Sequence, residues 1–337
     1  MSRNIQPERR FNNGKFVISL DFELFWGVRD LLTIDGYGEH IVGVRKAIPA
    51  MLSLFSKYNV SVTFSTVGFL FARDRDELKK YLPQLKPTYR QQNLSPYESI
   101  GQIGFDEFDD PYHFGHSLLS MIADNKQHEI GSHTFSHYYC LEPGQDLAQF
   151  EADLQAAVNI ATLKQVQVRS LVFPRNQFNA GYLEACRRNG IVAYRGNPDS
   201  GLYAARDGQS ETAARRGLRL LDAYLNISGH NCHSPEYILA SVIPNIAASR
   251  FLRPFSKRLA FADGLRLRRI TSAMSHAASE NKLFHLWWHP HNFGKDLEQN
   301  IGFLEKILQH YSILHNQSGF QSQTMASLAD ELINNNG

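Results

Sequence analysis

Two histidines with metal-ligand spacing stand in the segment HEIGSHTFSHYYC, residues 128–140. His133 and His137 are four positions apart, so on a helix or in a tight turn both imidazoles can reach one ion. Many such pairs are accidents of a histidine-rich surface loop, and the spacing alone leaves that alternative open. Because a catalytic zinc site takes three protein ligands and keeps one position for water, the pair predicts a metal site only if the chain supplies a third ligand.

Two carboxylates, Asp21 and Glu23, close the apolar, strand-like segment KFVISLDFE. Residues i and i+2 of a strand point to the same side, so both side chains would project from one face. In a barrel of parallel strands the active site forms at the carboxyl ends of the strands. Paired carboxylates are costly there unless positive charge lies beside them. The pair therefore predicts a metal ligand and a general base; the alternative is a solvated strand end with a helix cap.

Two further strand-like segments end in residues suited to the same chemistry. Arg175, in SLVFPRN, could orient a carboxylate base and hold its pKa down, unless it is a surface arginine after a proline turn. His289 ends KLFHLWWHP beside two tryptophans, a setting that suits a general acid. In this segment we expect His285 to be structural, and His291 to contact the substrate or to support the site.

Strand-like and helix-like segments alternate along the chain. The helical period of HIVGVRKAIPAMLSLFSKYN follows the first strand, and later strands are expected in VSVTFSTVGFLF, HEIGSH, SLVFPRN, IVAYRGN and KLFHLWWHP. Repeated strand–helix units imply a parallel sheet or barrel. Two stretches, about 73–127 and 197–275, break the rhythm. We expect them to be functional lids or peripheral insertions within a single domain over 1–337.

The composition narrows the class of protein. A hydrophobic fraction of 43% and a charged fraction of 20% are those of a globular protein with a buried core. The formal net charge of +2 indicates no polyanionic partner, and we expect no nucleic-acid ligand. The three cysteines lie far apart and form no disulfide pattern. Since we also find no signal peptide or membrane-spanning stretch, we expect a cytoplasmic protein.

The four motifs resemble those of the polysaccharide deacetylase family, carbohydrate esterase family 4. A carboxylate pair, a histidine pair, an arginine and a histidine follow one another in that order at successive strand ends. The resemblance runs from about Lys15 to the end of the chain, where FQSQTMASLADEL is similar to the family's last strand and helix. It implies an irregular (β/α) barrel of about seven strands with long inserted loops.

The resemblance assigns the metal ligands and the base. Asp21 would be the base, and Glu23, His133 and His137 would hold a divalent metal, with Zn²⁺ as the first choice. The family's commonest first motif has adjacent aspartates, whereas SLDFE resembles a subgroup with acid-x-acid spacing. This spacing leaves the roles of Asp21 and Glu23 open to exchange.

The resemblance also assigns the remaining site residues. Arg175 would contact the base, although proline precedes the arginine here, and His289 would be the acid. The residues expected to contact the substrate are Trp26, Tyr138, Trp288 and His291.

The implied activity is the metal-dependent removal of an N-acyl group, acetyl or formyl, from a sugar. The metal would polarise the amide carbonyl, Asp21 would accept a proton from water, and His289 would protonate the leaving amine. Without an export signal, the expected substrate is a nucleotide-linked or lipid-linked precursor in surface polysaccharide biosynthesis. The alternatives are a non-catalytic glycan-binding protein on the same fold, or a metal-dependent hydrolase of another ester or amide, for which HNCH at 230–233 is the candidate second cluster.

A basic, apolar segment at 249–270 bears on the partners. SRFLRPFSKRLAFADGLRLRRI carries seven basic side chains and one acid, interleaved with Phe and Leu. It could grip a lipid-linked diphosphate or lie on the anionic inner face of a membrane. The alternative is a solvated, charged helix face.

Overall fold

The computed structural model describes residues 11–207, 210 and 212–335. The first ten residues lie outside this part. They include most of the polar N-terminal stretch from which we expected no export signal. None of the described helices is both long enough and apolar enough to cross a lipid bilayer.

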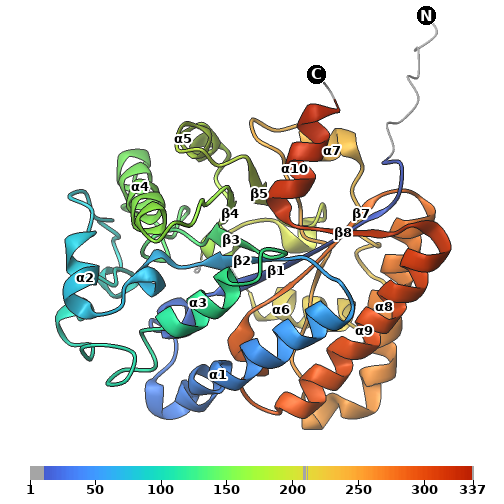
Figure 1. The fold of residues 1–337 in the computed structure, drawn as a ribbon, viewed down its shortest axis with the longest axis horizontal. Coiled ribbons are helices and arrows are strands. Elements are labelled where there is room, and N and C mark those ends of the chain that lie inside the picture. Colours follow the sequence, from blue (N-terminus) through green and yellow to red (C-terminus); the bar gives the residue numbers. More distant parts are fainter. Residues whose placement is uncertain (1–10, 208–209, 211, 336–337) are drawn as a thin grey trace, which may run out of the picture.

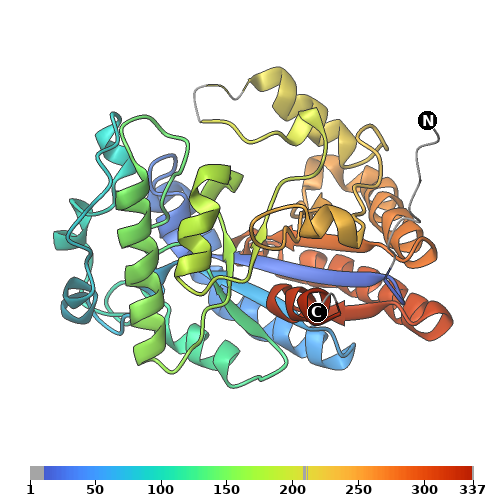
Figure 2. The same ribbon diagram turned by 90° about the horizontal axis from the view of Figure 1, so that it is seen from above.

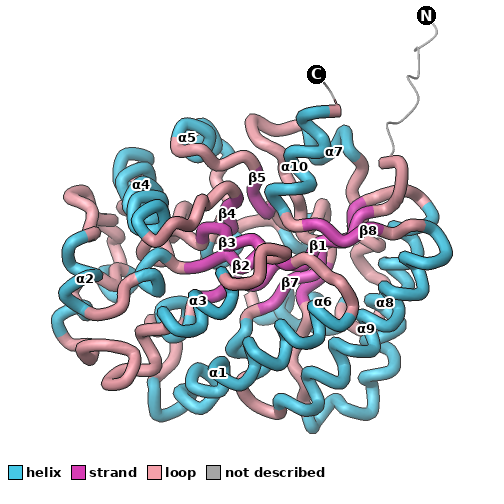
Figure 3. Tube along the Cα trace, viewed as in Figure 1, coloured by secondary structure: helices cyan, strands magenta, loops and turns pink. Residues whose placement is uncertain are grey.

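Eight strands of the described chain form one curled, parallel sheet at the centre of the molecule (Figures 1 and 3). The strand order is β5-β4-β3-β2-β1-β7-β6, and β8 pairs with the start of β1. This arrangement confirms the expected irregular (β/α) barrel. The strands are β1 (Lys15–Phe22), β2 (Val62–Thr66), β3 (Glu129–Ser132), β4 (Ser170–Val172), β5 (Ala193–Arg195), β6 (Arg250–Phe251), β7 (Leu283–Trp288) and β8 (Gln321–Gln323).

Helices lie around the sheet (Figure 2). The α-helices are α1 (Ile34–Lys57), α2 (Arg75–Lys80), α3 (His116–Ala123), α4 (Leu147–Leu163), α5 (Leu183–Arg188), α6 (Ala213–Asp222), α7 (Pro235–Leu239), α8 (Asp263–Ser279), α9 (Leu297–Ser318) and α10 (Met325–Asn334). Among the described residues, the 3₁₀ helices are Leu24–Gly27, Gly68–Phe71, Gln92–Leu94, Ser99–Gly101, Pro174–Asn176, Ala180–Tyr182, Gly201–Tyr203, Lys257–Ala262 and Pro290–Phe293. The closing strand and helix expected in FQSQTMASLADEL are β8 and α10.

The central strand β1 positions the first site residues. All eight of its residues are buried, as in parallel sheets that are covered on both faces. Phe16, Ile18 and Leu20 belong to the main apolar cluster, which also includes residues of α1 and α9. Because side chains alternate along a strand, Ser19 and Asp21 point to the opposite side, into the barrel.

An irregular segment, 244–252, joins the two edges of the sheet. The Ile246 N–H donates to the Tyr194 carbonyl of β5 at 2.9 Å, and the Ser249 N–H donates to the His285 carbonyl of β7 at 2.8 Å. The stretch 197–275 is therefore not an insertion throughout, since it supplies β6 and most of α8 to the barrel. The other expected insertion, 73–127, carries α2 and α3.

Candidate metal centre and active site

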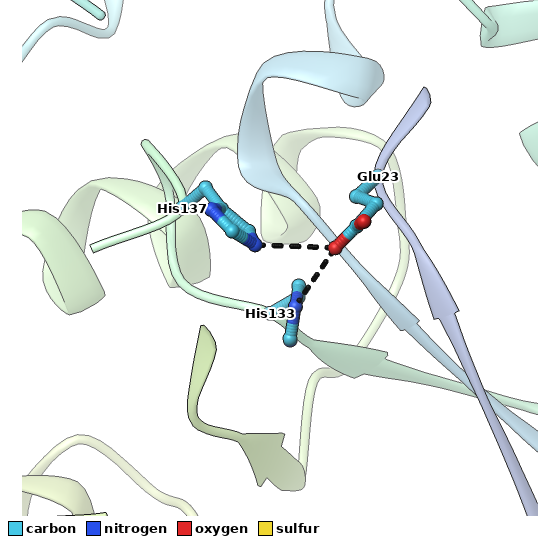
Figure 4. Close-up of side chains that lie close together, drawn as sticks. All are labelled: Glu23, His133 and His137. Carbon is cyan, nitrogen blue, oxygen red and sulfur yellow. Dashed lines mark hydrogen bonds and ion pairs between the residues drawn. The ribbon is translucent and has the colours of Figure 1, made fainter. Parts of the chain in front are cut away.

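Glu23, His133 and His137 form a compact, buried cluster (Figure 4). The Glu23 Oε2 atom lies 3.2 Å from His133 Nε2 and 3.1 Å from His137 Nε2. One potential ligand atom from each residue lies within 4.8 Å of the others, a size that suits a single ion. Among the described residues, no other group of three or more His, Cys, Asp or Glu side chains meets this criterion.

The backbone that follows β3 brings the two histidines together without forming a helix. Thr134 and His137 both adopt positive φ, at 61° and 60°, so the chain makes a tight, irregular turn. The buried Asp153 of α4 holds this turn, because its Oδ1 accepts from the Phe135 N–H at 2.7 Å and its Oδ2 accepts from the Ser136 hydroxyl. The tight-turn form of the prediction is correct, and the helix form is wrong.

The hydrogen bonds of the histidines leave their Nε2 atoms available to a metal. His133 Nδ1 lies 2.8 Å from the Val172 carbonyl, so this nitrogen donates and Nε2 carries the lone pair. Burial lowers the pKa of His137 to about 4, although Glu23 opposes the shift, so this ring is neutral near pH 7. The Nε2 atoms of both imidazoles thus face one carboxylate oxygen, and a cation could take two nitrogen ligands and one oxygen ligand from these three side chains. The donor set fits a divalent metal.

Asp21 lies beside this cluster in a pair with a buried arginine. The Arg195 guanidinium donates from Nη1 to Asp21 Oδ1 at 2.7 Å and from Nη2 to Asp21 Oδ2 at 2.8 Å. Burial is the largest influence on the pKa of Asp21 and raises it, but the charge and hydrogen bonds of Arg195 together with the nearby His133 and His289 outweigh burial, and the net shift is downward. Asp21 is therefore ionised at neutral pH.

Arg195 is itself held by neighbours inside the barrel. Its Nη2 donates to Asn176 Oδ1 at 3.0 Å, its Nη1 donates to Ser19 Oγ at 2.8 Å, and the guanidinium lies over the Trp287 ring. Ser19 Oγ in turn lies 2.8 Å from His285 Nε2. Burial lowers the pKa of His285 to about 3, which fits the structural role expected for this histidine.

The expected contact between Arg175 and the base is wrong. Arg175 has a φ of 54°, its guanidinium lies over the Tyr139 ring, and it pairs with Asp30. The arginine that contacts Asp21 is Arg195, at the end of β5. Arg195 ends the strand expected in IVAYRGN, and this position at a strand end is the sequence signal that points to it.

His289 lies between the Glu23–His133–His137 cluster and the Asp21–Arg195 pair. Its Nε2 lies 3.7 Å from both Asp21 Oδ2 and Glu23 Oε1. Its ring stacks on His291 with 4.9 Å between ring centroids, and its Nδ1 is 3.4 Å from Asn292 Oδ1. Since the His289 side chain is partly exposed, it can approach both the carboxylates and a bound molecule.

The residues expected to contact the substrate are buried instead. Trp26 donates to the His113 carbonyl at 2.8 Å, Tyr138 donates to Gln145, and Trp288 stacks on Phe293. His291 is buried with its Nδ1 3.9 Å from Glu23 Oε1. The substrate role expected for Trp26, Tyr138, Trp288 and His291 is therefore not supported by their positions.

Side chains alternate along β7, which explains why Trp287 reaches the site and the expected Trp288 does not. His285 and Trp287 point into the barrel, and Trp288 points toward the helices. Trp287 and His289 line a cavity of about 550 Å³ that also contacts Asn176. The exposed aromatic face at the site thus comes from Trp287.

The HNCH segment, 230–233, lies away from this centre. His233 pairs with Leu283, the first residue of β7, whereas His289 follows the last residue of that strand. The segment therefore supplies no second metal cluster to the site.

Comparisons with known proteins agree with the fold. The sequence model of the polysaccharide deacetylases matches residues 31–194, a part that holds His133 and His137 but neither carboxylate of the site. A candidate polysaccharide deacetylase from Mycobacterium smegmatis has a similar structure, with a TM-score of 0.59, 11% identity and coverage of 98% of this chain and 93% of that chain. Puue allantoinase is similar with a TM-score of 0.53, 12% identity and coverage of 97% and 93%. No curated protein matches the sequence.

Proposed function

We propose that this chain, a member of the polysaccharide deacetylase family, is a metal-dependent hydrolase that removes an acetyl or formyl group from an N-acylated sugar. The observation that carries the proposal is the position of His289, whose Nε2 is 3.7 Å from the paired carboxylate Asp21 and from the cluster carboxylate Glu23. A base, an acid and a three-residue metal set therefore meet at one point, as hydrolysis of an amide requires.

The contacts support one division of labour between the two carboxylates. Glu23 faces both imidazoles and would hold the metal with His133 and His137. Asp21, ionised beside Arg195, would accept the proton of the attacking water. A bound divalent cation, Zn²⁺ in our proposal, supplies Lewis-acid polarisation of the amide carbonyl.

His289 would complete the reaction by protonating the leaving amine. Its Nδ1 faces the Asn292 amide oxygen, so Nδ1 can donate there while Nε2 exchanges its proton with the substrate. Its partial exposure at the cavity places this proton where the amine leaves.

An acid-release assay tests the proposed activity. We expect N-acetyl or N-formyl sugars to release acetate or formate with added Zn²⁺, and Asp21→Asn and His133→Ala to lower the rate by at least about 100-fold. Asp35→Asn is the matched control, because Asp35 is exposed in the first turn of α1. Full activity of Asp21→Asn would overturn the assignment of the base.

Two alternatives predict different results in the same experiment. A non-catalytic glycan-binding protein would bind sugars and release no acid. A hydrolase of another amide or ester would be active only on other substrates; allantoin is one to include, since the fold is similar to that of Puue allantoinase. Metal content, measured on the purified protein, separates the binding protein from both hydrolases.

The proposed substrate is a nucleotide-linked or lipid-linked precursor in surface polysaccharide biosynthesis, processed in the cytoplasm. For a lipid-linked precursor, we also propose contact with the membrane through the exposed part of 249–270. Three of the basic residues of this segment are buried and pair inside the protein: Arg250 and Arg269 with Asp222, and Arg266 with Asp263. The exposed part includes the basic residues Lys257, Arg258 and Arg268 and the apolar residues Phe261 and Leu265.

A further inference from the structure

The cavity beside His289 extends well beyond the catalytic residues. Its volume is about 550 Å³, within the range of pockets that enclose a small molecule. Trp287, His289 and Asn176 lie at the catalytic end. An N-acylated sugar at this end would leave much of the cavity for whatever the sugar is attached to.

Arginines dominate the rest of the cavity wall, and no Asp or Glu is among the described residues that line it. Arg175 and Arg250 also reach the cavity, but their charges are balanced by Asp30 and Asp222. The other lining arginines are Arg206, Arg216, Arg219 and Arg253.

Three of these arginines have no ion pair within the described part of the chain. Neither a carboxylate nor a side-chain hydrogen bond partner there is found for Arg206, Arg216 or Arg253. Arg253 is partly buried, and burial is the main cause that lowers its pKa. Like charges around a partly enclosed cavity repel one another, so the arrangement favours an anion among them.

The arginines of helix α6 that line the cavity lie on one side of the helix. Arg216, Arg219, Leu220 and Ala223 line the cavity from one side of the helix. At 100° per residue, Leu218 and Leu221 fall on the opposite side of α6, and both are exposed. An apolar side in solvent and a basic side toward a cavity is the reverse of an ordinary surface helix, so the basic side serves the cavity.

We infer that Arg206, Arg216 and Arg253 form a subsite for the phosphate groups of a sugar diphosphate whose N-acyl group lies at His289. Planar guanidinium groups bind phosphate oxygens in pairs of charge-assisted hydrogen bonds. The inference rests on the proposed function for the position of the sugar, and it deepens that function by naming a phosphorylated substrate class. It also moves the expected diphosphate contact away from most of 249–270, since Arg253 alone belongs to both.

Calorimetric titration with inorganic pyrophosphate tests the subsite directly. We expect Arg216→Gln and Arg253→Gln each to raise Kd by about tenfold, and raising NaCl from 50 to 200 mM to weaken binding further. Arg268→Gln is the matched control, because Arg268 is exposed on α8 and does not line the cavity. No binding to the wild type, or equal binding to all these proteins, would overturn the inference.

A second variant separates the subsite from the metal centre, to which pyrophosphate could also bind. Glu23→Gln should weaken the metal set and leave pyrophosphate binding to the arginines in place. Loss of binding in Glu23→Gln together with unchanged binding in the arginine variants would place the anion on the metal and contradict the subsite. Because none of these readouts needs acid release, failure of the proposed activity would not obscure the result.

Titrations with UDP and with farnesyl diphosphate distinguish the two sources of the diphosphate. Tighter binding of UDP would assign a nucleotide carrier, and tighter binding of farnesyl diphosphate a lipid carrier. In either case the tighter ligand should lose about tenfold in affinity in Arg216→Gln. An unchanged affinity of both ligands in that variant would count against the subsite.

Discussion

The chemistry of each carboxylate at the site is determined by its neighbours rather than by its own type. Asp21 is matched by a guanidinium that contacts both of its oxygens, so its negative charge is retained inside the barrel. Glu23, two positions later, faces imidazole nitrogens. In our proposal this difference assigns the base to Asp21 and the metal ligand to Glu23, a division that the acid-x-acid spacing alone leaves open.

Replacing Arg195 by glutamine should raise the pKa of Asp21, because it removes the strongest of the charges that oppose burial. The acidic limb of the profile of kcat/KM against pH should move to higher pH, since the base must be ionised. Stability at pH 7 should fall by about 3–5 kcal/mol, the usual cost of leaving one partner of a buried pair unmatched. In the wild type, this pair stabilises the fold above the unfolded pKa of aspartate, and the effect is lost as pH falls through the lower folded pKa.

Arg175→Gln is the comparison, because its guanidinium pairs with Asp30. Its acidic limb should stay where the wild type has it. A limb that moves in Arg175→Gln and stays in Arg195→Gln would restore the original expectation from the FPRN motif. Urea unfolding of both variants shows whether the larger loss in the free energy of unfolding also belongs to Arg195→Gln.

At the scale of elements, strand ends were predictable and the turns after them were not. Alternation and apolar runs locate β1, β3 and β7, and therefore Asp21, His133 and His289. Arg175 adopts a positive φ and pairs with Asp30 instead of Asp21, and no periodic pattern encodes either feature. Strand β6 has two residues, too few to show a period in the sequence. It lies within the segment 244–252, which forms hydrogen bonds with β5 on one side and β7 on the other.

Replacing Asp153 tests how far a helix residue controls the turn that carries His133 and His137. Asp153→Ala would leave the Phe135 N–H and the Ser136 hydroxyl without their buried acceptor. We expect a loss of about 2–3 kcal/mol in the free energy of unfolding and weaker Zn²⁺ binding, because the turn that carries His133 and His137 loses its support. Urea unfolding and a Zn²⁺ titration measure the two effects; unchanged Zn²⁺ affinity would show that the turn holds its shape alone.

Asp153→Asn isolates the titration of the same side chain. Burial raises the pKa of Asp153 to about 6, so between pH 4 and 6 the folded protein binds more protons than the unfolded chain. Wild-type stability from this group should then fall as pH rises through that window, by roughly 3 kcal/mol. The stability advantage of the wild type over Asp153→Asn should therefore shrink from pH 4 to pH 6, and an advantage that grows would contradict the raised pKa.

Metal removal should loosen the link between two distant segments of the chain. Glu23 follows β1, and both histidines follow β3, so a bound ion connects these elements in the folded state alone. Zn²⁺ at about 100 times its Kd should add about 2.7 kcal/mol to the free energy of unfolding. A chelator should lower the Tm of the wild type and leave the Tm of Glu23→Gln nearly unchanged; equal shifts in both proteins would place the metal elsewhere.

For the whole molecule, a net charge of +2 conceals strong local segregation. Arginines gather around the cavity, whereas residues 106–110 read DEFDD. The composition excludes a uniformly basic protein. It does not predict where the charges lie, because their positions depend on which loops the barrel brings together. The same applies to 249–270, where pairing with Asp222 and Asp263 buries three arginines that the sequence pattern alone would place on a basic surface.

The exposed part of 249–270 should bind anionic vesicles through Phe261, whose exposed fraction is 88%, and the basic residues beside it. Phe261→Ser should weaken sedimentation with vesicles that contain anionic phospholipid, because it removes the apolar group that enters the interface. Lys257→Gln with Arg258→Gln should cost about 1 kcal/mol per charge and remove much of the salt dependence. Phe108→Ser is the matched control: Phe108 is 98% exposed but lies among the acidic residues of 106–110, which anionic lipid repels. Equal losses in Phe261→Ser and Phe108→Ser would mean that exposed aromatic area alone drives association, and binding unchanged in every variant would remove this surface as a membrane contact.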